Sequence, residues 1–182
     1  METIDTLMDE HTGILMVLDQ AEIAAAAAAT GQAVPKDVFT DIQDFFAVFV
    51  DKCHHGKEED ELFPLLARAG ERGIADRLLE EHTEGRALAA AYAAAVDAYA
   101  PGNAAAGSKV EDAVEAYSSF LRRHIGTETG ELFPAVERRL YNSDEVIAQA
   151  FERLEVQKIG AGTHERLHHM IEGLGARISP WT

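Results

Sequence analysis

The feature that most constrains this sequence is an internal repeat. Residues 54–64 align with residues 124–134, so that histidine, glutamate and Leu-Phe-Pro recur in register at an offset of 70 (54 to 124). Residues 7–12 align with residues 78–83 at an offset of 71 (7 to 78), and each copy contains Glu-His. Self-similarity at nearly the same spacing indicates that a single structural unit occurs twice. Each half of the chain therefore carries an early histidine followed later by His-x-x-x-Glu.

The segments between the turn signals have the spacing of helices. They are rich in alanine, and their apolar residues recur at helical rather than alternating intervals. We expect four long helices, which span about residues 4–30, 37–69, 72–100 and 108–140. Pro64 predicts a kink near the end of the second helix, and Pro134 lies inside the fourth. Short loops between long helices predict an all-α protein, an up-down four-helix bundle made of a duplicated helical hairpin.

The sequence after residue 140 predicts an additional short helical segment at the C-terminus. Ser143-Asp144-Glu145 is typical of a helix start, and Gly160-Ala161-Gly162 interrupts the helical pattern. Thr163 is a candidate cap for a final short helix, and residues 179–182 are expected to fray. We therefore expect a bundle over residues 1–140 and a C-terminal helical extension over residues 141–182 that packs on it.

The charge and the cysteine content exclude several classes of partner. The 182 residues contain 16 basic and 32 acidic side chains, a net charge of −16 that repels phosphate backbones and anionic lipids. The longest nearly uncharged stretch, residues 23–34, is too short to span a bilayer. The single cysteine, Cys53, and an acidic N-terminus without a basic leader predict a cytoplasmic protein. We expect no nucleic-acid or membrane partner, and Cys53 is expected to be a small core residue.

The two His-x-x-x-Glu pairs have the spacing of metal ligands. Residues four apart lie on one face of a helix, so His54 points the same way as Glu58, and His124 the same way as Glu128. Both pairs continue apolar stripes, and a carboxylate inside a bundle is costly unless it is paired or bound to metal. With His11 and His82, these residues offer two nitrogens and one bridging carboxylate per ion. The sequence thus predicts a two-metal site with open positions.

The donor set narrows the choice of ion. Imidazole and carboxylate without thiolate suit iron, manganese or zinc better than copper(I), calcium or magnesium. Open positions and bridging carboxylates favour redox-active iron. We therefore expect two non-haem iron ions in an Fe-O-Fe type centre, with manganese and zinc as the less favoured ions.

A competing pair lies one residue further along the second helix. His55 and Glu59 have the same spacing as His54 and Glu58, and periodicity alone barely separates the two registers. The repeat favours the first register, because Ile125 and Thr129 occupy the other one in the second half. His55 and Glu59 remain additional candidates, as an outer contact or a further ligand.

A second possible metal-binding motif lies near the C-terminus. His164-Glu165-Arg166-Leu167-His168 matches the His-Glu-x-x-His pattern of zinc metalloproteases. The pattern is short, no third ligand follows within residues 174–182, and an α-bundle has no strand to align a peptide. We expect His164, His168 and His169 to lie on a terminal helix packed on the bundle, and His164 and His168 remain additional metal candidates. The segment contains a single Glu-x-x-His, whereas ferritin-like diiron bundles use two, so iron storage is disfavoured.

These residues resemble the hemerythrin-like proteins with the HHE cation-binding domain. The matching elements span residues 7–136: Glu10-His11, residues 53–59 with 62–64, Glu81-His82, and His124-x-x-x-Glu128 with residues 132–134. The resemblance implies a four-helix bundle around a non-haem diiron centre, with the ligands His11, His54, Glu58, His82, His124 and Glu128. It also implies that the two glutamates bridge the irons. Oxygen-carrying hemerythrins have another histidine one turn after the third-helix histidine; Arg86 stands there and argues against a dedicated oxygen carrier.

The favoured function is binding or sensing of a small molecule. We expect a diiron protein that binds dioxygen, nitric oxide or peroxide at an open iron site and signals through another protein. The alternative is a diiron enzyme that uses a cellular electron donor to detoxify peroxide or nitric oxide, or that supplies iron for iron-sulfur cluster repair. A metal-free helical interaction module is the third hypothesis. Alanine-rich helix faces permit close packing in a monomer or in a homodimer.

Overall fold

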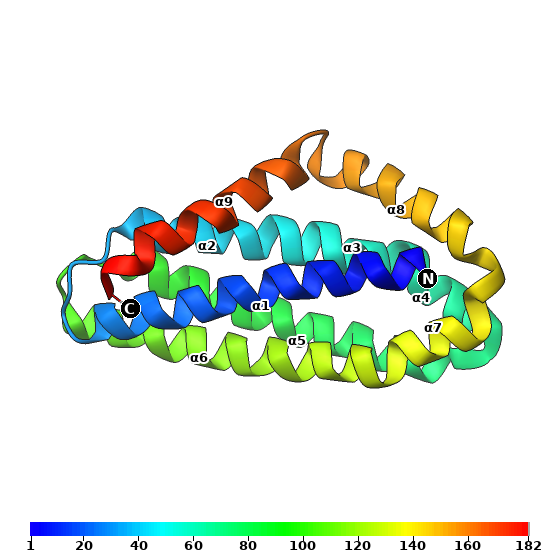
Figure 1. The fold of residues 1–182 in the computed structure, drawn as a ribbon. Coiled ribbons are helices and arrows are strands. Elements are labelled where there is room, and N and C mark those ends of the chain that lie inside the picture. Colours follow the sequence, from blue (N-terminus) through cyan, green and yellow to red (C-terminus); the bar gives the residue numbers. More distant parts are fainter. Residues whose placement is uncertain (182) are drawn as a thin grey trace.

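The fold consists of helices only, which confirms the all-α prediction. The computed structural model describes residues 1–181, except for the side chains of His164, Glu165 and His168. Within this described part no strand occurs, and short turns join the helices. Four long helical segments lie side by side and alternate in direction (Figure 1).

The four segments follow the predicted order along the chain. The first segment is α1 (Glu2–Ala29), and the third is α5 (Arg72–Ala98). The second segment contains α2 (Lys36–Phe45), η1 (Phe46–His54), α3 (His55–Lys57), η2 (Glu58–Leu62), α4 (Phe63–Leu66) and η3 (Ala67–Glu71). The fourth segment contains α6 (Ala104–Thr127), η4 (Glu128–Leu132) and α7 (Phe133–Leu140). Gly70 separates the second and third segments, because its φ of 96° is a left-handed conformation that favours glycine.

The fourth segment begins four residues earlier than the predicted start at Ser108. Its first helical residue is Ala104, and Asn103 is the N-cap, since the Asn103 side chain accepts a hydrogen bond from the Ala106 N–H at 3.1 Å. Asparagine satisfies one of the free N–H groups of a first helical turn. The prediction was wrong because it did not recognise Asn103 as the N-cap, which adds residues 104–107 to the helix.

Wider π-helical turns interrupt both segments that carry His-x-x-x-Glu. The segments η2 and η4 cover residues 58–62 and 128–132, so they recur at the offset of the sequence repeat (58 to 128, 70 residues). Pro64 and Pro134 follow two residues after each one. Proline lacks an N–H and its ring clashes with the carbonyl four residues earlier, so the preceding turn widens instead of continuing as a regular α-helix. Glu58 and Glu128 each begin such a turn.

The C-terminal residues form two further helices that lie along the first and second segments (Figure 1). After η5 (Tyr141–Ser143) come α8 (Asp144–Ile159) and α9 (Thr163–Ile178), followed by η6 (Ser179–Trp181) in place of the expected frayed end. Thr163 is the first residue of α9 rather than its cap. Gly162 caps the helix with a φ of 75°, and the Thr163 hydroxyl donates to the Ile159 carbonyl. The division at residue 140 stays a prediction.

The apolar core has two parts, and the predicted site residues lie between them. One cluster includes Phe49, Val50, Phe120 and Leu121, and extends along α1, α2, α5 and α6. The other cluster is centred on the two Leu-Phe pairs before the prolines, Leu62-Phe63 and Leu132-Phe133. The His-x-x-x-Glu residues fall between these clusters in the sequence of each segment. Apolar side chains therefore exclude water from both ends of a polar layer.

The first segment packs closely against α6. A Cβ atom at Gly107 would overlap the backbone of Ala28, so glycine is required at this crossing.

Among the described residues, α1 is the one helix long and apolar enough to cross a membrane, with a window of mean hydropathy 1.3. Half of that window is buried inside the protein, as in the core helix of a globular domain.

Candidate metal centre

The structure brings the six predicted ligand residues together from all four segments. His11 lies on α1, His54 and Glu58 on the second segment, His82 on α5, and His124 and Glu128 on the fourth segment. Each of these side chains is at most 4% exposed. Residues separated by more than a hundred positions thus meet in one buried layer.

The six side chains form two groups whose ligand atoms lie within 4.8 Å of one another. The first group contains His11, His54 and Glu128, and the second contains Glu58, His82, His124 and Glu128. The Nε2 atom of His11 lies 2.9 Å from Oε2 of Glu128, while Nε2 of His124 lies 3.0 Å from the other oxygen, Oε1. Glu128 therefore presents one carboxylate oxygen to each group.

Glu58 occupies the corresponding position on the opposite side. Its Oε2 atom lies 3.3 Å from Nε2 of His82 and 4.0 Å from Nε2 of His54. Both glutamates therefore stand between the two histidine groups, which is the arrangement that a bridging carboxylate needs.

The inward-facing atoms lack the hydrogen bonds that a metal-free core would require. Both oxygens of Glu58 and of Glu128, and Nε2 of His82 and of His124, are buried without a hydrogen-bond partner in the described part of the chain. Buried polar atoms without partners are rare, because each costs about 1–3 kcal/mol. The short contacts lack hydrogen-bond geometry but suit atoms that share a cation. The donor set therefore fits metal ions.

The electrostatics of the layer also favour a cation. Burial and the neighbouring charge of Glu128 raise the pKa of Glu58. Burial opposes protonation of His82, but contacts with Glu128, Glu58 and Glu59 raise its pKa to about 11. Without a metal, the two carboxylates favour a bound proton in the layer. A metal cation would neutralise the same negative charge.

Carboxylates behind the histidines orient the rings. The Nδ1 atom of His54 donates to Glu10 at 2.8 Å, and that of His124 donates to Glu81 at 2.7 Å. This contact occurs twice because Glu10 and Glu81 are equivalent in the repeat. Hydrogen bonds of this kind fix the tautomer and leave Nε2 free to bind a metal. The sequence showed the repeated Glu-His, but its pattern did not reveal that each glutamate supports the histidine of another segment.

The ring of His82 is oriented by a different carboxylate, that of Glu59. The Nδ1 atom of His82 donates to Glu59 at 2.7 Å, and Arg86 donates to the same oxygen through Nη2 at 2.7 Å. Thr129 stands at the equivalent position of the second copy and cannot supply a carboxylate. Glu59 therefore faces away from the two groups, whereas Glu58 faces into them.

His55 lies at the edge of the second group. Its ring stacks on that of His82 with the centroids 3.9 Å apart, and one of its nitrogens lies within 4.8 Å of the ligand atoms of His82 and His124. Burial lowers the pKa of His55 to about 3, so the imidazole is neutral. Both ring nitrogens lack a hydrogen bond within the described residues. His55 thus remains available as an additional contact.

Lys57 is a buried residue that the sequence did not single out. Its ammonium group donates to Glu10 and, at 3.1 Å, to Glu155 of α8. Cys53 lies close to Glu10 and Glu155. Burial raises the pKa of the Cys53 thiol to about 12, so the thiol stays neutral. Lys57 already supplies the positive charge for these two carboxylates. The predicted candidates His164 and His168 lie outside the described side chains.

The helices and the two His/Glu groups together define a helical protein with candidate metal-binding groups in its core. The profile of the hemerythrin HHE cation binding domain matches residues 2–136. The chain belongs to this family, as the sequence motifs predicted. Comparison with curated proteins and with solved structures gives no match.

Proposed function

We propose that this protein is a non-haem diiron protein that binds dioxygen, nitric oxide or peroxide at an open site, as a sensor or a binding protein. The observation that carries the proposal is the pair of buried carboxylates, Glu58 and Glu128, which lie without hydrogen bonds between two histidine groups. When bound, iron would supply redox chemistry and open coordination positions.

The residues of the chain divide into holding and orienting roles. We infer that the four segments form an up-down four-helix bundle in which His11 and His54 hold one ion, and His82 and His124 hold the other. Glu58 and Glu128 would help to hold both ions. Behind them, Glu10, Glu59 and Glu81 orient the rings of His54, His82 and His124. Manganese and zinc remain the less favoured ions for this donor set.

The position of Arg86 supports a sensor or binding protein with an open site rather than a dedicated oxygen carrier. Arg86 stands one turn after His82 and binds Asp51 and Glu59, at 2.6 and 2.7 Å. A guanidinium group cannot be a metal ligand because it has no acceptor atom. The Arg86 position would therefore supply no ligand to an ion held by His82, which supports an open position for a small molecule on that side.

The second candidate function is enzymatic reduction of peroxide or nitric oxide. It is favoured by a chain of contacts from His54 through Glu10 and Lys57 to Glu155, which is 27% exposed at the surface. Reduction consumes protons, whereas reversible binding does not, and this chain leads from the centre to solvent. Sustained turnover with an electron donor would distinguish the enzyme from the sensor.

The setting of the protein is part of the proposal. We propose that it acts in the cytoplasm, with a signalling protein or an electron donor as its partner and without nucleic acid or membrane. The net charge of −16 supports the exclusion of anionic surfaces.

Metal analysis and an optical spectrum test the proposal. Protein purified without oxygen is expected to contain about two iron ions per chain, as in other two-metal sites, and to gain an oxo-bridged diferric absorption band in air. His54→Ala/His124→Ala should lose both the iron and the band. His169→Ala is the matched control, because the His169 side chain is 80% exposed on α9. Absence of iron, or iron that survives the double substitution, would contradict the proposal.

A further inference from the structure

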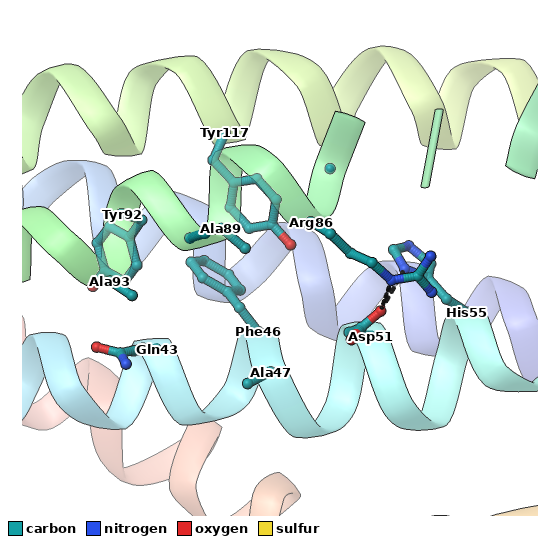
Figure 2. A pocket seen from close by; sticks show the side chains of 12 residues that line it. Gln43, Phe46, Ala47, Asp51, His55, Arg86, Ala89, Tyr92, Ala93 and Tyr117 are labelled. Atoms are coloured by element: carbon teal, nitrogen blue, oxygen red, sulfur yellow. Dashed lines mark hydrogen bonds and ion pairs between the residues drawn. The ribbon is translucent and has the colours of Figure 1, made fainter. Parts of the chain in front are cut away.

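A cleft beside the metal centre lies between the second segment and α5. Its volume is about 320 Å³, and Tyr117 of α6 also lines it (Figure 2). One end reaches His55, Asp51 and Arg86, next to the second histidine group. The cleft therefore adjoins the centre and shares with it only His55, at the edge of the second group.

Most of the cleft wall is apolar. The rings of Phe46, Tyr92 and Tyr117 stand along it, and Phe46 contacts Tyr117 edge to face with the centroids 4.7 Å apart. Ala89 and Ala93 of α5 lie along the same wall (Figure 2). Their small side chains leave open the space that a larger residue would fill. This wall suits an organic group rather than an ion.

The inner end of the cleft is polar and has unused hydrogen-bonding capacity. His55 is 2% exposed, and neither of its ring nitrogens has a hydrogen bond among the described residues. Arg86 uses Nε for Asp51 and Nη2 for Glu59, but a guanidinium has five N–H donors. Figure 2 shows the Tyr117 hydroxyl turned toward this end. Burial and the charge of Asp51 raise the pKa of Tyr117, so the Tyr117 hydroxyl keeps its proton and can donate it in a hydrogen bond.

The size of the cleft indicates what kind of molecule it holds. Dioxygen, nitric oxide and hydrogen peroxide are close to water in size, and water occupies about 30 Å³ in the liquid. A cleft of about 320 Å³ is roughly ten times larger and lies within the range of sites for small organic ligands. The apolar wall offers far more contact area than a molecule of two to four atoms can use, whereas an organic group can cover it.

We propose that this cleft binds organic hydroperoxides, with the organic group against the alanines and aromatic rings and the oxygen end at His55. This inference rests on the proposed function, because it names the peroxide that the neighbouring centre receives. The hydroperoxide O–H donates to a ring nitrogen of His55; neither nitrogen has a hydrogen bond among the described residues, and Nδ1 lies 3.8 Å from Oδ1 of Asp51. Its oxygen atoms accept hydrogen bonds from the free N–H groups of Arg86 or from the Tyr117 hydroxyl.

Calorimetric titration with 2-phenyl-2-propanol, the unreactive alcohol of cumene hydroperoxide, tests the cleft directly. The purified full chain is expected to bind one molecule, and cumene hydroperoxide should displace it. Isopropylbenzene lacks the oxygen and should bind more weakly, because it cannot use His55, Arg86 or Tyr117. Equal binding of the two probes would overturn the assignment of the polar end, and failure to bind the alcohol would overturn the proposal.

Leucine substitutions on α5 provide matched variants. Ala89→Leu and, as a second blocking variant, Ala93→Leu fill the cleft and should weaken binding of the alcohol about tenfold or more, equivalent to about 1.4 kcal/mol. Ala91→Leu introduces the same side chain at an exposed position on the same helix, outside the cleft, and should bind like the wild type. Circular dichroism checks that each variant is folded. Unchanged binding in both folded blocking variants would show that the ligand lies elsewhere.

The two proposals fail in different ways. Iron content and the response to air are measured on the same samples as the titrations. Binding of the alcohol to a chain that contains no iron would overturn the proposed function and the hydroperoxide assignment with it, while retaining a ligand cleft. An iron centre that responds to air beside a cleft that binds no alcohol would overturn the cleft alone.

Discussion

At the scale of single residues, the glutamates that precede His11 and His82 in the sequence orient other histidines of the candidate centre. Glu10 and Glu81 each precede a predicted ligand in the chain, yet each contacts the histidine of a different segment. Glu10 also binds the buried ammonium group of Lys57. One carboxylate therefore orients a candidate ligand and neutralises a buried charge.

The contacts of Glu10 predict a specific dependence of stability on pH. Burial opposes ionisation, but His54 and Lys57 lower the pKa of Glu10 from 4.5 to about 2. A carboxylate with a lowered pKa stabilises the fold fully above its unfolded pKa, and this contribution is lost as the pH falls toward the folded value. In metal-free protein, the free energy of unfolding should therefore decrease from pH 4.5 toward pH 2.

The variant Glu10→Gln isolates this effect. At neutral pH it should destabilise the protein by about 3–5 kcal/mol, the usual cost of removing one partner of a buried ion pair. Urea unfolding at a series of pH values should show that its difference from the wild type shrinks below pH 4.5. Glu115→Gln, at an exposed position of α6, is the control. Parallel curves for wild type and Glu10→Gln would contradict the assignment.

At the scale of the elements, two helix irregularities and one close crossing position the centre. The wide turns η2 and η4 begin at Glu58 and Glu128, and π-helical turns occur frequently at functional sites. At the opposite end of the protein, Gly107 lets α6 approach the backbone of α1. His11 and His124 lie on these same two helices.

The close crossing predicts opposite effects for two substitutions of the same kind. Gly107→Ala should destabilise the protein by about 1–3 kcal/mol, because the added Cβ overlaps the backbone of Ala28 and the helices must move apart. Gly126→Ala should stabilise it by up to about 1 kcal/mol, since Gly126 lies in the same helix with open space around it. Thermal unfolding would measure both, and a fall in Tm for Gly126→Ala equal to that for Gly107→Ala would contradict the argument.

At the scale of the whole molecule, a polar layer separates two apolar clusters. All four segments contribute to the layer, so a bound metal would link them to one another. The helices α8 and α9 add contacts to the first and second segments, including the ion pair of Lys158 with Asp60 at 2.7 Å. The chain has enough apolar core to fold, but its centre contains unpaired polar atoms.

Metal binding should therefore stabilise the whole molecule. A ligand that binds only the folded state, at a free concentration 100 times its Kd, stabilises by about 2.7 kcal/mol. For a chain of this size, that value corresponds to a rise in Tm of about 5–10 °C. Differential scanning calorimetry before and after chelation would detect the change. The variant His54→Ala/His124→Ala should show no such difference, and an equal difference in that variant would place the metal elsewhere.

The sequence by itself determined the helical class, the family and the residue types of the candidate centre. Helical spacing and the 70-residue repeat are properties of the linear chain, and they identify His54 with Glu58 and His124 with Glu128 as one motif used twice. The structure gathers these residues with His11 and His82, and their role as metal ligands stays a prediction. Local signals were weaker at helix starts: α6 begins at Ala104 rather than near Ser108, and Gly162 rather than Thr163 is the N-cap of α9.

Only the tertiary structure decided which atoms meet. The contact of Glu10 with His54, the ion pairs of Lys57 and the cleft along α5 join residues on different segments. Their positions depend on how closely the helices cross and on the rotamers of the side chains, which no spacing in a single segment encodes. For the same reason, periodicity could not separate His54 from His55, whereas the packed helices place His54 in the first group and His55 at the end of the cleft.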